Sequence, residues 1–169
     1  DVRPIERVFL GDPDVSEAVY RLWKAAGEGR RLQEEVRVSG APGEPGPDAA
    51  NPRIDNKSGQ ILEITDEHAG TDFTWELLMV GGDPEAADTY FAGFDKTRVS
   101  PISCPDNLAF DSHGNLWIST DGNALDSNDG LFAVALEGPN RGETKQFLTV
   151  PLGGETCGPV VTDDLVTVC

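Results

Sequence analysis

The sequence predicts a mainly β protein made of β-propeller blades, as a partial propeller, with a helix at its N-terminus. The chain contains 19 glycines and 12 prolines. Short apolar runs lie between them, which is typical of a turn-rich β protein and not of a helical bundle. These runs follow one another as hairpins, as in a meander of small sheets. The 169 residues suffice for one domain with its own core.

A helical period marks the N-terminal region from residue 12 to about residue 35. Asp14, with Glu17 three residues later, resembles a capping box at its start. Apolar residues recur there at steps of three and four: Val15, Ala18, Val19, Leu22, Trp23 and Ala26. We therefore predict an N-terminal helical segment over residues 1–39 and a β-propeller portion over residues 40–169.

The propeller portion begins with a loop and continues as strand pairs. Residues 39–55 are dense in Gly, Pro and Asp, which predicts a long loop. Strands are expected over 59–65 and 73–80, over the two runs of residues 104–123 on either side of a turn at 111–115, over 130–136 and 144–148, and over 160–161 and 165–168. These strands make about two to three blades, whereas closed propellers have at least about four. We therefore expect a fragment, whose open strand edges favour self-association.

The stretch CPDNLAFDSHGNLWISTDGN over residues 104–123 predicts a hairpin with acidic residues at its open end. The segment 111–115 between its two apolar runs has the composition of a turn. Asp106 and Asp121 therefore fall near the same edge of the hairpin. Carboxylates gathered in this way suit a hard cation such as calcium. The alternative interpretation is that both are solvated carboxylates at strand ends.

The charge balance excludes some classes of partner. The chain has 30 acidic and 13 basic residues, a net charge of −17. The negative electrostatic field of this charge repels phosphate backbones and anionic lipid, so we predict no binding to nucleic acid or to a membrane surface. It attracts divalent cations, although solubility and adaptation to a salty medium explain the charge equally well. An anionic substrate would bind only where bound cations reverse the local sign.

The cysteines do not form a recognisable site. Cys104, Cys157 and Cys169 have neither CxxC nor zinc-site spacing, and their odd number excludes full internal pairing. A cysteine nucleophile is disfavoured, because the nearest histidine in the sequence, His113, falls in a turn. No apolar run approaches the ~20 residues that span a bilayer, so no membrane insertion is expected. The first residues do not have the pattern of a signal peptide.

Four segments together resemble the PhoX family of bacterial alkaline phosphatases. They are AANPRIDNKSGQI at 49–61, FTWELLMVGGDP at 73–84, CPDNLAFDSHGNLWISTDGN at 104–123 and FLTVPLGGETCGP at 147–159. Their order and approximate spacing also match. The combination is specific, whereas the hairpin alone occurs in many calcium-containing propellers, including lactonase-like ones.

The resemblance implies a β-propeller enzyme that hydrolyses small phosphate monoesters, is periplasmic or secreted, and holds calcium and iron ions around the substrate phosphate. It implies that Glu155 is a metal ligand. Further candidates for the metal site are Asp106 and Asp121, and candidates for substrate binding are Asn51, Arg53 and Asn56. For Arg53, a bidentate pair with phosphate oxygens and a structural pair with a carboxylate both stay open.

The chain also departs from the family pattern. Only Arg3–Glu6 partly matches the Arg-Pro-Glu segment that the family carries upstream, and the metal-binding cysteine that the family places further upstream has no counterpart. We therefore keep two alternatives. One is a calcium-dependent, lactonase-like propeller hydrolase. The other is a catalytically inactive propeller fragment with a structural or binding role.

Overall fold

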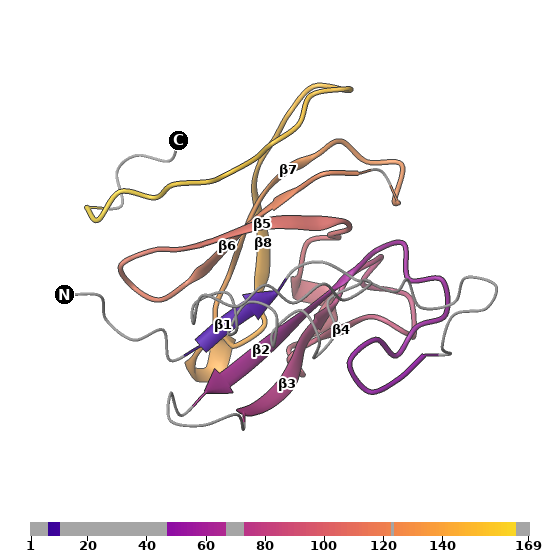
Figure 1. Cartoon of the computed structure of the whole chain (residues 1–169). Coiled ribbons are helices and arrows are strands. Elements are labelled where there is room, and N and C mark those ends of the chain that lie inside the picture. Colours follow the sequence, from indigo (N-terminus) through magenta and orange to yellow (C-terminus); the bar gives the residue numbers. More distant parts are fainter. Residues whose placement is uncertain (1–6, 11–46, 67–72, 123, 165–169) are drawn as a thin grey trace, which may run out of the picture.

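The computed structural model describes residues 7–10, 47–66, 73–122 and 124–164; the helix predicted from residue 12 lies outside them. The described residues form two four-stranded antiparallel sheets (Figure 1). The strand orders are β1-β2-β3-β4 and β5-β6-β7-β8, so each sheet is a meander in chain order. The mainly β class is therefore confirmed.

The strands expected between residues 59 and 148 agree with those observed to within a few residues, whereas residues 160–161 form no strand and the strand expected over 165–168 lies outside the described residues. The first sheet contains β1 (Arg7–Leu10), β2 (Gln60–Asp66), β3 (Phe73–Val80) and β4 (Tyr90–Phe91). The second contains β5 (Pro105–Phe110), β6 (Leu116–Thr120), β7 (Gly130–Val134) and β8 (Thr144–Thr149). Two short 3-10 helices, η1 (Lys96–Arg98) and η2 (Gly138–Asn140), lie in connections. β1, β4 and the 3-10 helices are not predicted by the sequence pattern.

One apolar cluster joins the two sheets. Side chains alternate between the faces of a strand, so Leu116 and Ile118 of β6 point to the same side. From the first sheet the cluster takes Ile61, Leu78, Met79 and Phe91, and from the second Leu116, Ile118, Phe132 and Val134, all at most 4% exposed. Full burial of one such side chain stabilises the fold by about 1.5–3 kcal/mol. This packing joins the two sheets through one core.

Arg141 adds a polar link between the sheets. It follows β7 in the β7–β8 connection, and its Nη2 donates to Glu63 of β2 at 2.6 Å and to Glu76 of β3. Its Nη1 donates to the carbonyl of Leu136 at 2.7 Å. The Glu63 side chain is only 4% exposed. A buried carboxylate needs such a partner, so Arg141 fixes the sheets at the β7–β8 end.

Candidate functional site

The opposite end of the two sheets gathers every candidate residue named from the sequence. We call it the site rim, and it comprises residues 51–59, 104–107, 120–122, 129–130 and 155–158. Pro105 pairs with Thr120, so the start of β5 lies beside the end of β6. Asp106 and Asp121 therefore lie at the same end of one hairpin, as the sequence predicts.

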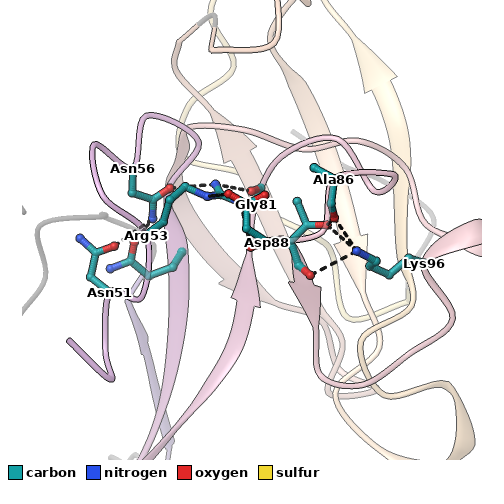
Figure 2. A network of polar contacts seen from close by, with 9 residues as sticks. Asn51, Arg53, Asn56, Gly81, Ala86, Asp88 and Lys96 are labelled. Atoms are coloured by element: carbon teal, nitrogen blue, oxygen red, sulfur yellow. Dashed lines mark hydrogen bonds and ion pairs between the residues drawn. The ribbon is translucent and has the colours of Figure 1, made fainter. Parts of the chain in front are cut away.

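Arg53 organises the first part of the rim (Figure 2). Its Nε donates to Asp88 Oδ2 at 2.8 Å and its Nη2 to the Asp88 carbonyl at 2.9 Å. Its Nη1 donates to Asn56 Oδ1 at 3.0 Å and to the Gly81 carbonyl at 2.8 Å. The side chain is only 14% exposed. These bonds use four of the five guanidinium N–H groups, so Arg53 ties the 51–59 loop to the end of β3.

The amides of the loop continue this network. Asn56 Nδ2 donates to Asn51 Oδ1 at 3.2 Å and to Gln60 Oε1 at 2.7 Å, and all three residues are buried. The three predicted substrate-binding residues, Asn51, Arg53 and Asn56, thus form one unit. Their contacts with one another show how the loop is held. Contact with substrate stays a prediction for all three.

The turn over residues 83–89 supports Arg53 from the other side. The hydrogen bond from Arg53 holds the pKa of Asp88 below its ordinary value of 3.8, against the opposing effect of burial. Figure 2 shows that Lys96 reaches the same turn. Its Nζ donates to the Ala86 carbonyl at 2.6 Å and to Thr89 Oγ1 at 3.1 Å. The turn that presents Asp88 is therefore anchored at two points.

Cys104 connects the 51–59 loop to the hairpin. Its N–H donates to the Ser58 carbonyl at 2.9 Å, and its thiol lies 3.4 Å from the Lys57 carbonyl. Its own carbonyl accepts from the N–H of Asp121 at 3.1 Å. Cys104 has a φ of 54°, and a Cβ on Gly122 would lie 2.7 Å from its sulfur. The close packing explains why glycine stands at position 122 and indicates a structural thiol.

The predicted metal ligands Asp106, Asp121 and Glu155 are all exposed at the rim. Their carboxylate oxygens are of the type that calcium prefers. Within the described part of the chain, however, no group of three or more His, Cys, Asp or Glu side chains is arranged to hold a metal ion. These residues alone therefore do not fit a complete site for calcium or iron.

Three rim residues that the sequence analysis did not single out are joined by hydrogen bonds. Thr120 Oγ1 donates to Asp129 Oδ1 at 3.1 Å, and Thr156 Oγ1 donates to the Gly130 carbonyl, next to Asp129, at 2.8 Å. We call Thr120, Asp129 and Thr156 the rim clasp. The only sequence signal was the repeated Asp-Gly step at 121–122 and 129–130.

Asp111 stabilises the far end of the hairpin. Its Oδ1 accepts from the N–H groups of His113 and Asn115, both at 2.9 Å. Its Oδ2 accepts from the Asn115 amide at 2.9 Å and from Trp117 Nε1 at 3.0 Å. Burial opposes ionisation, but hydrogen bonds, chiefly from the Asn115 and Trp117 side chains, hold the pKa of Asp111 below its ordinary value. Asp111 therefore shapes the turn as an ionised carboxylate.

The fold and the rim together define a mainly β protein with a polar, carboxylate-bearing candidate site at one end of its sheets. Residues 13–169 match the family described as Alkaline phosphatase PhoX, and the chain belongs to this family. The resemblance drawn from the sequence is thereby confirmed.

Two known proteins show how far the similarity extends. The structure of Pseudomonas fluorescens PhoX in complex with vanadate, a transition state analogue, is similar with a TM-score of 0.58 and 31% identity, over 74% of this chain and 23% of that chain. The Sensor kinase CckA of Brucella abortus (strain 2308) is 28% identical over 90 residues, which are 53% of this chain and 10% of that protein. The chain thus spans less than a quarter of either relative.

Proposed function

We propose that this chain contributes one wall of the active site of a PhoX-type alkaline phosphatase, which hydrolyses phosphate monoesters with the help of bound calcium and iron. The family match over residues 13–169 supports this most, since all six candidate residues lie within it. The similarity to a protein whose structure holds vanadate, a transition state analogue, agrees with phosphoryl chemistry. In this proposal each four-stranded sheet is one blade of a propeller.

The charge of the rim supports metal dependence. A phosphate monoester is an anion, and the exposed carboxylates of Asp106, Asp121 and Glu155 repel it. Bound cations reverse the local sign, and when bound they also polarise a phosphoryl oxygen or activate water. We propose these three residues as oxygen ligands that act with further ligands outside the described part of the chain. Because the described residues do not complete the site, we assign the ions no individual step.

For the substrate side of the rim we propose Asn51, Arg53 and Asn56. Arg53 retains one guanidinium N–H beyond the four contacts described above, so it can offer a single hydrogen bond to a phosphate oxygen without breaking its network. A bidentate contact would require release of Asp88 or of a loop acceptor. The geometry therefore favours the structural pairing of Arg53 and limits its contact with substrate to one N–H group.

The central experiment measures metal content and hydrolysis together in the full-length protein. We expect hydrolysis of an aryl phosphate that a chelator abolishes and that calcium with iron restores, and no hydrolysis of a lactone. Glu155→Ala lowers both metal content and activity, whereas Glu137→Ala, a control at the opposite end of the sheets, changes neither. Unchanged metal stoichiometry in Glu155→Ala excludes Glu155 as a ligand.

The same experiment separates the alternatives. Calcium-dependent lactone hydrolysis without phosphate hydrolysis would identify a lactonase-like enzyme. Loss of both activities and of metal binding would indicate an inactive protein with a structural or binding role.

We propose a periplasmic or secreted location from the family resemblance. Among the described residues, no helix has the length and apolar character to cross a membrane. Self-association through strand edges also stays a proposal. All residues of β8 after Thr144 are exposed, but Ser100 Oγ accepts from the Gln146 N–H at 3.0 Å and the Ser100 N–H donates to the Thr144 carbonyl. Part of this edge is thus covered, so association by the remainder should appear in sedimentation only at high protein concentration.

A further inference from the structure

We infer that Asp129 and Thr156 are positioning residues that hold Asp121 and Glu155 at a fixed separation on the site rim. The inference rests on the proposed function, in which those two carboxylates serve the reaction. Neither Asp129 nor Thr156 needs to contact substrate or metal in this role. Asp129 acts through hydrogen bonds to the two residues that flank Asp121, and Thr156, which follows Glu155 in the chain, acts through its hydrogen bond to the Gly130 carbonyl.

Asp129 fixes Asp121 from both sides. Its Oδ1 accepts from Thr120 Oγ1 at 3.1 Å and from the N–H of Gly122 at 3.0 Å, and these two residues flank Asp121 in the chain. Thr120 is only 3% exposed, so its hydroxyl is held in a dry environment where a hydrogen bond is strong. The Asp121 N–H in turn donates to the Cys104 carbonyl. Three consecutive residues are thereby tied down.

Thr156 fixes Glu155 to the same framework. Its Oγ1 donates to the Gly130 carbonyl at 2.8 Å, and the Thr120 carbonyl lies within 3.4 Å of the same hydroxyl. The N–H of Gly158 donates to Asn107 Oδ1 at 2.8 Å, which provides a second attachment after Glu155. The peptide that carries Glu155 is therefore attached to the ends of β5, β6 and β7.

The two attachments meet at the start of β7. Thr120 Oγ1 accepts from the N–H of Gly130, and the Gly130 carbonyl accepts from Thr156, so one residue connects both halves of the rim clasp. The Asp129 carbonyl also accepts from the Val150 N–H at 2.9 Å, which anchors this corner to the chain after β8. Asp121 and Glu155 are distant in sequence, yet the segments that carry them are both hydrogen-bonded to residues 129–130 at the start of β7.

The test compares variants that keep a hydrogen bond with variants that remove it. Asp129→Asn keeps an oxygen acceptor but loses the charge, and Asp129→Ala loses both. Thr156→Ser keeps the hydroxyl, and Thr156→Val replaces it at nearly constant volume. In the full-length protein we expect the Asn and Ser variants to hydrolyse an aryl phosphate within about twofold of the unaltered protein. We expect Ala and Val to lower kcat by roughly 10- to 100-fold with a smaller change in KM, since misplaced groups carry costs of this order.

Amide hydrogen exchange gives a readout that does not depend on activity. We expect the Gly122 amide to exchange at least about tenfold faster in Asp129→Ala than in Asp129→Asn, because only the alanine removes its acceptor. If Asp129→Asn folds but loses activity as fully as Asp129→Ala, the charge itself is needed and the positioning role is overturned. Full activity in folded Thr156→Val overturns the role of Thr156.

Failure of the proposed function gives a different result. If the unaltered protein hydrolyses no phosphate ester, the phosphatase proposal fails, and the clasp is then judged by exchange alone. Unchanged protection of the Gly122 amide in Asp129→Ala overturns the clasp. Should Asp129→Ala not fold, the comparison of Asp129→Asn with the unaltered protein still decides between acceptor and charge.

Discussion

Arg53→Ala provides the sharpest test of how the 51–59 loop is held. The substitution removes the donor from two acceptors in a buried setting, Asn56 Oδ1 and the Gly81 carbonyl. A buried acceptor that loses its partner costs about 1–3 kcal/mol. It also removes the pair with Asp88, but that carboxylate is 60% exposed, so solvent screening limits this contribution to about 0.5 kcal/mol. Because both bonds are only part-buried, each acceptor is taken near the lower end of this range, and we expect a total loss of about 3 kcal/mol.

Urea unfolding followed by circular dichroism measures this loss. With a slope of about 2 kcal/mol per molar urea for a protein of this size, the midpoint should fall by about 1.5 M. Arg53→Lys keeps the charge but not the planar fork, and should lose about half as much. Lys57→Ala is the matched control, because the pair of Lys57 with Asp55 is 75% and 65% exposed and should contribute almost nothing. An Arg53→Ala midpoint equal to that of Lys57→Ala would refute the loop-anchoring role.

Three further outcomes follow from the contacts described. Asp111→Asn should destabilise the protein most above about pH 4 and progressively less at lower pH, because the stability that ionised Asp111 contributes is lost as pH falls through its lowered pKa. Urea unfolding at several pH values measures this effect. A difference in unfolding free energy between the variant and the unaltered protein that does not change with pH contradicts it. Arg141→Met should lower the free energy of unfolding by about 3 kcal/mol, because it removes the cation next to buried Glu63. Glu76→Gln, at a carboxylate that is 63% exposed, should lower it by under about 1 kcal/mol. Equal losses in the two variants would show that the burial of Glu63 does not determine the strength of the ion pair. Gly142→Ala should lower the midpoint of thermal unfolding by about 5 °C or more. Gly142 has a φ of 89°, and its added Cβ would clash with a backbone carbonyl of β4. An unchanged midpoint contradicts this.

Local pattern predicted the long strands well. The runs over β3 and over the β5–β6 hairpin are rich in apolar residues and are bounded by turn residues, so the bounds of β3 and the position of the hairpin turn could be read directly. β4 could not be found in this way, because its two residues form a strand only through pairing with Met79 and Val80 of β3. β1 forms by pairing with β2 across the 49 intervening residues 11–59, and a four-residue run gives no signal of such a distant partner.

The candidate site was predictable in part for the same reason. Asp106 and Asp121 belong to one hairpin, so their shared edge follows from strand pairing. The approach of Ser58 to Cys104 connects two sheets and depends on their packing, which local sequence does not encode. Asp129 was missed because its partners include the Gly122 backbone N–H, and a backbone donor leaves no residue-type signature.

Cys104 restricts how this fold could be recombined with its relatives. It is hydrogen-bonded to residues 57 and 58 on one side and to Asp121 on the other. Cys104 therefore links the two sheets, which are not interchangeable modules. A chimera with its crossover in the connection over residues 92–100 would take residues 57 and 58 from one parent and Cys104 from the other. Such chimeras should fold well only when the second parent supplies a residue at position 104 that tolerates a φ of 54° and a glycine at position 122.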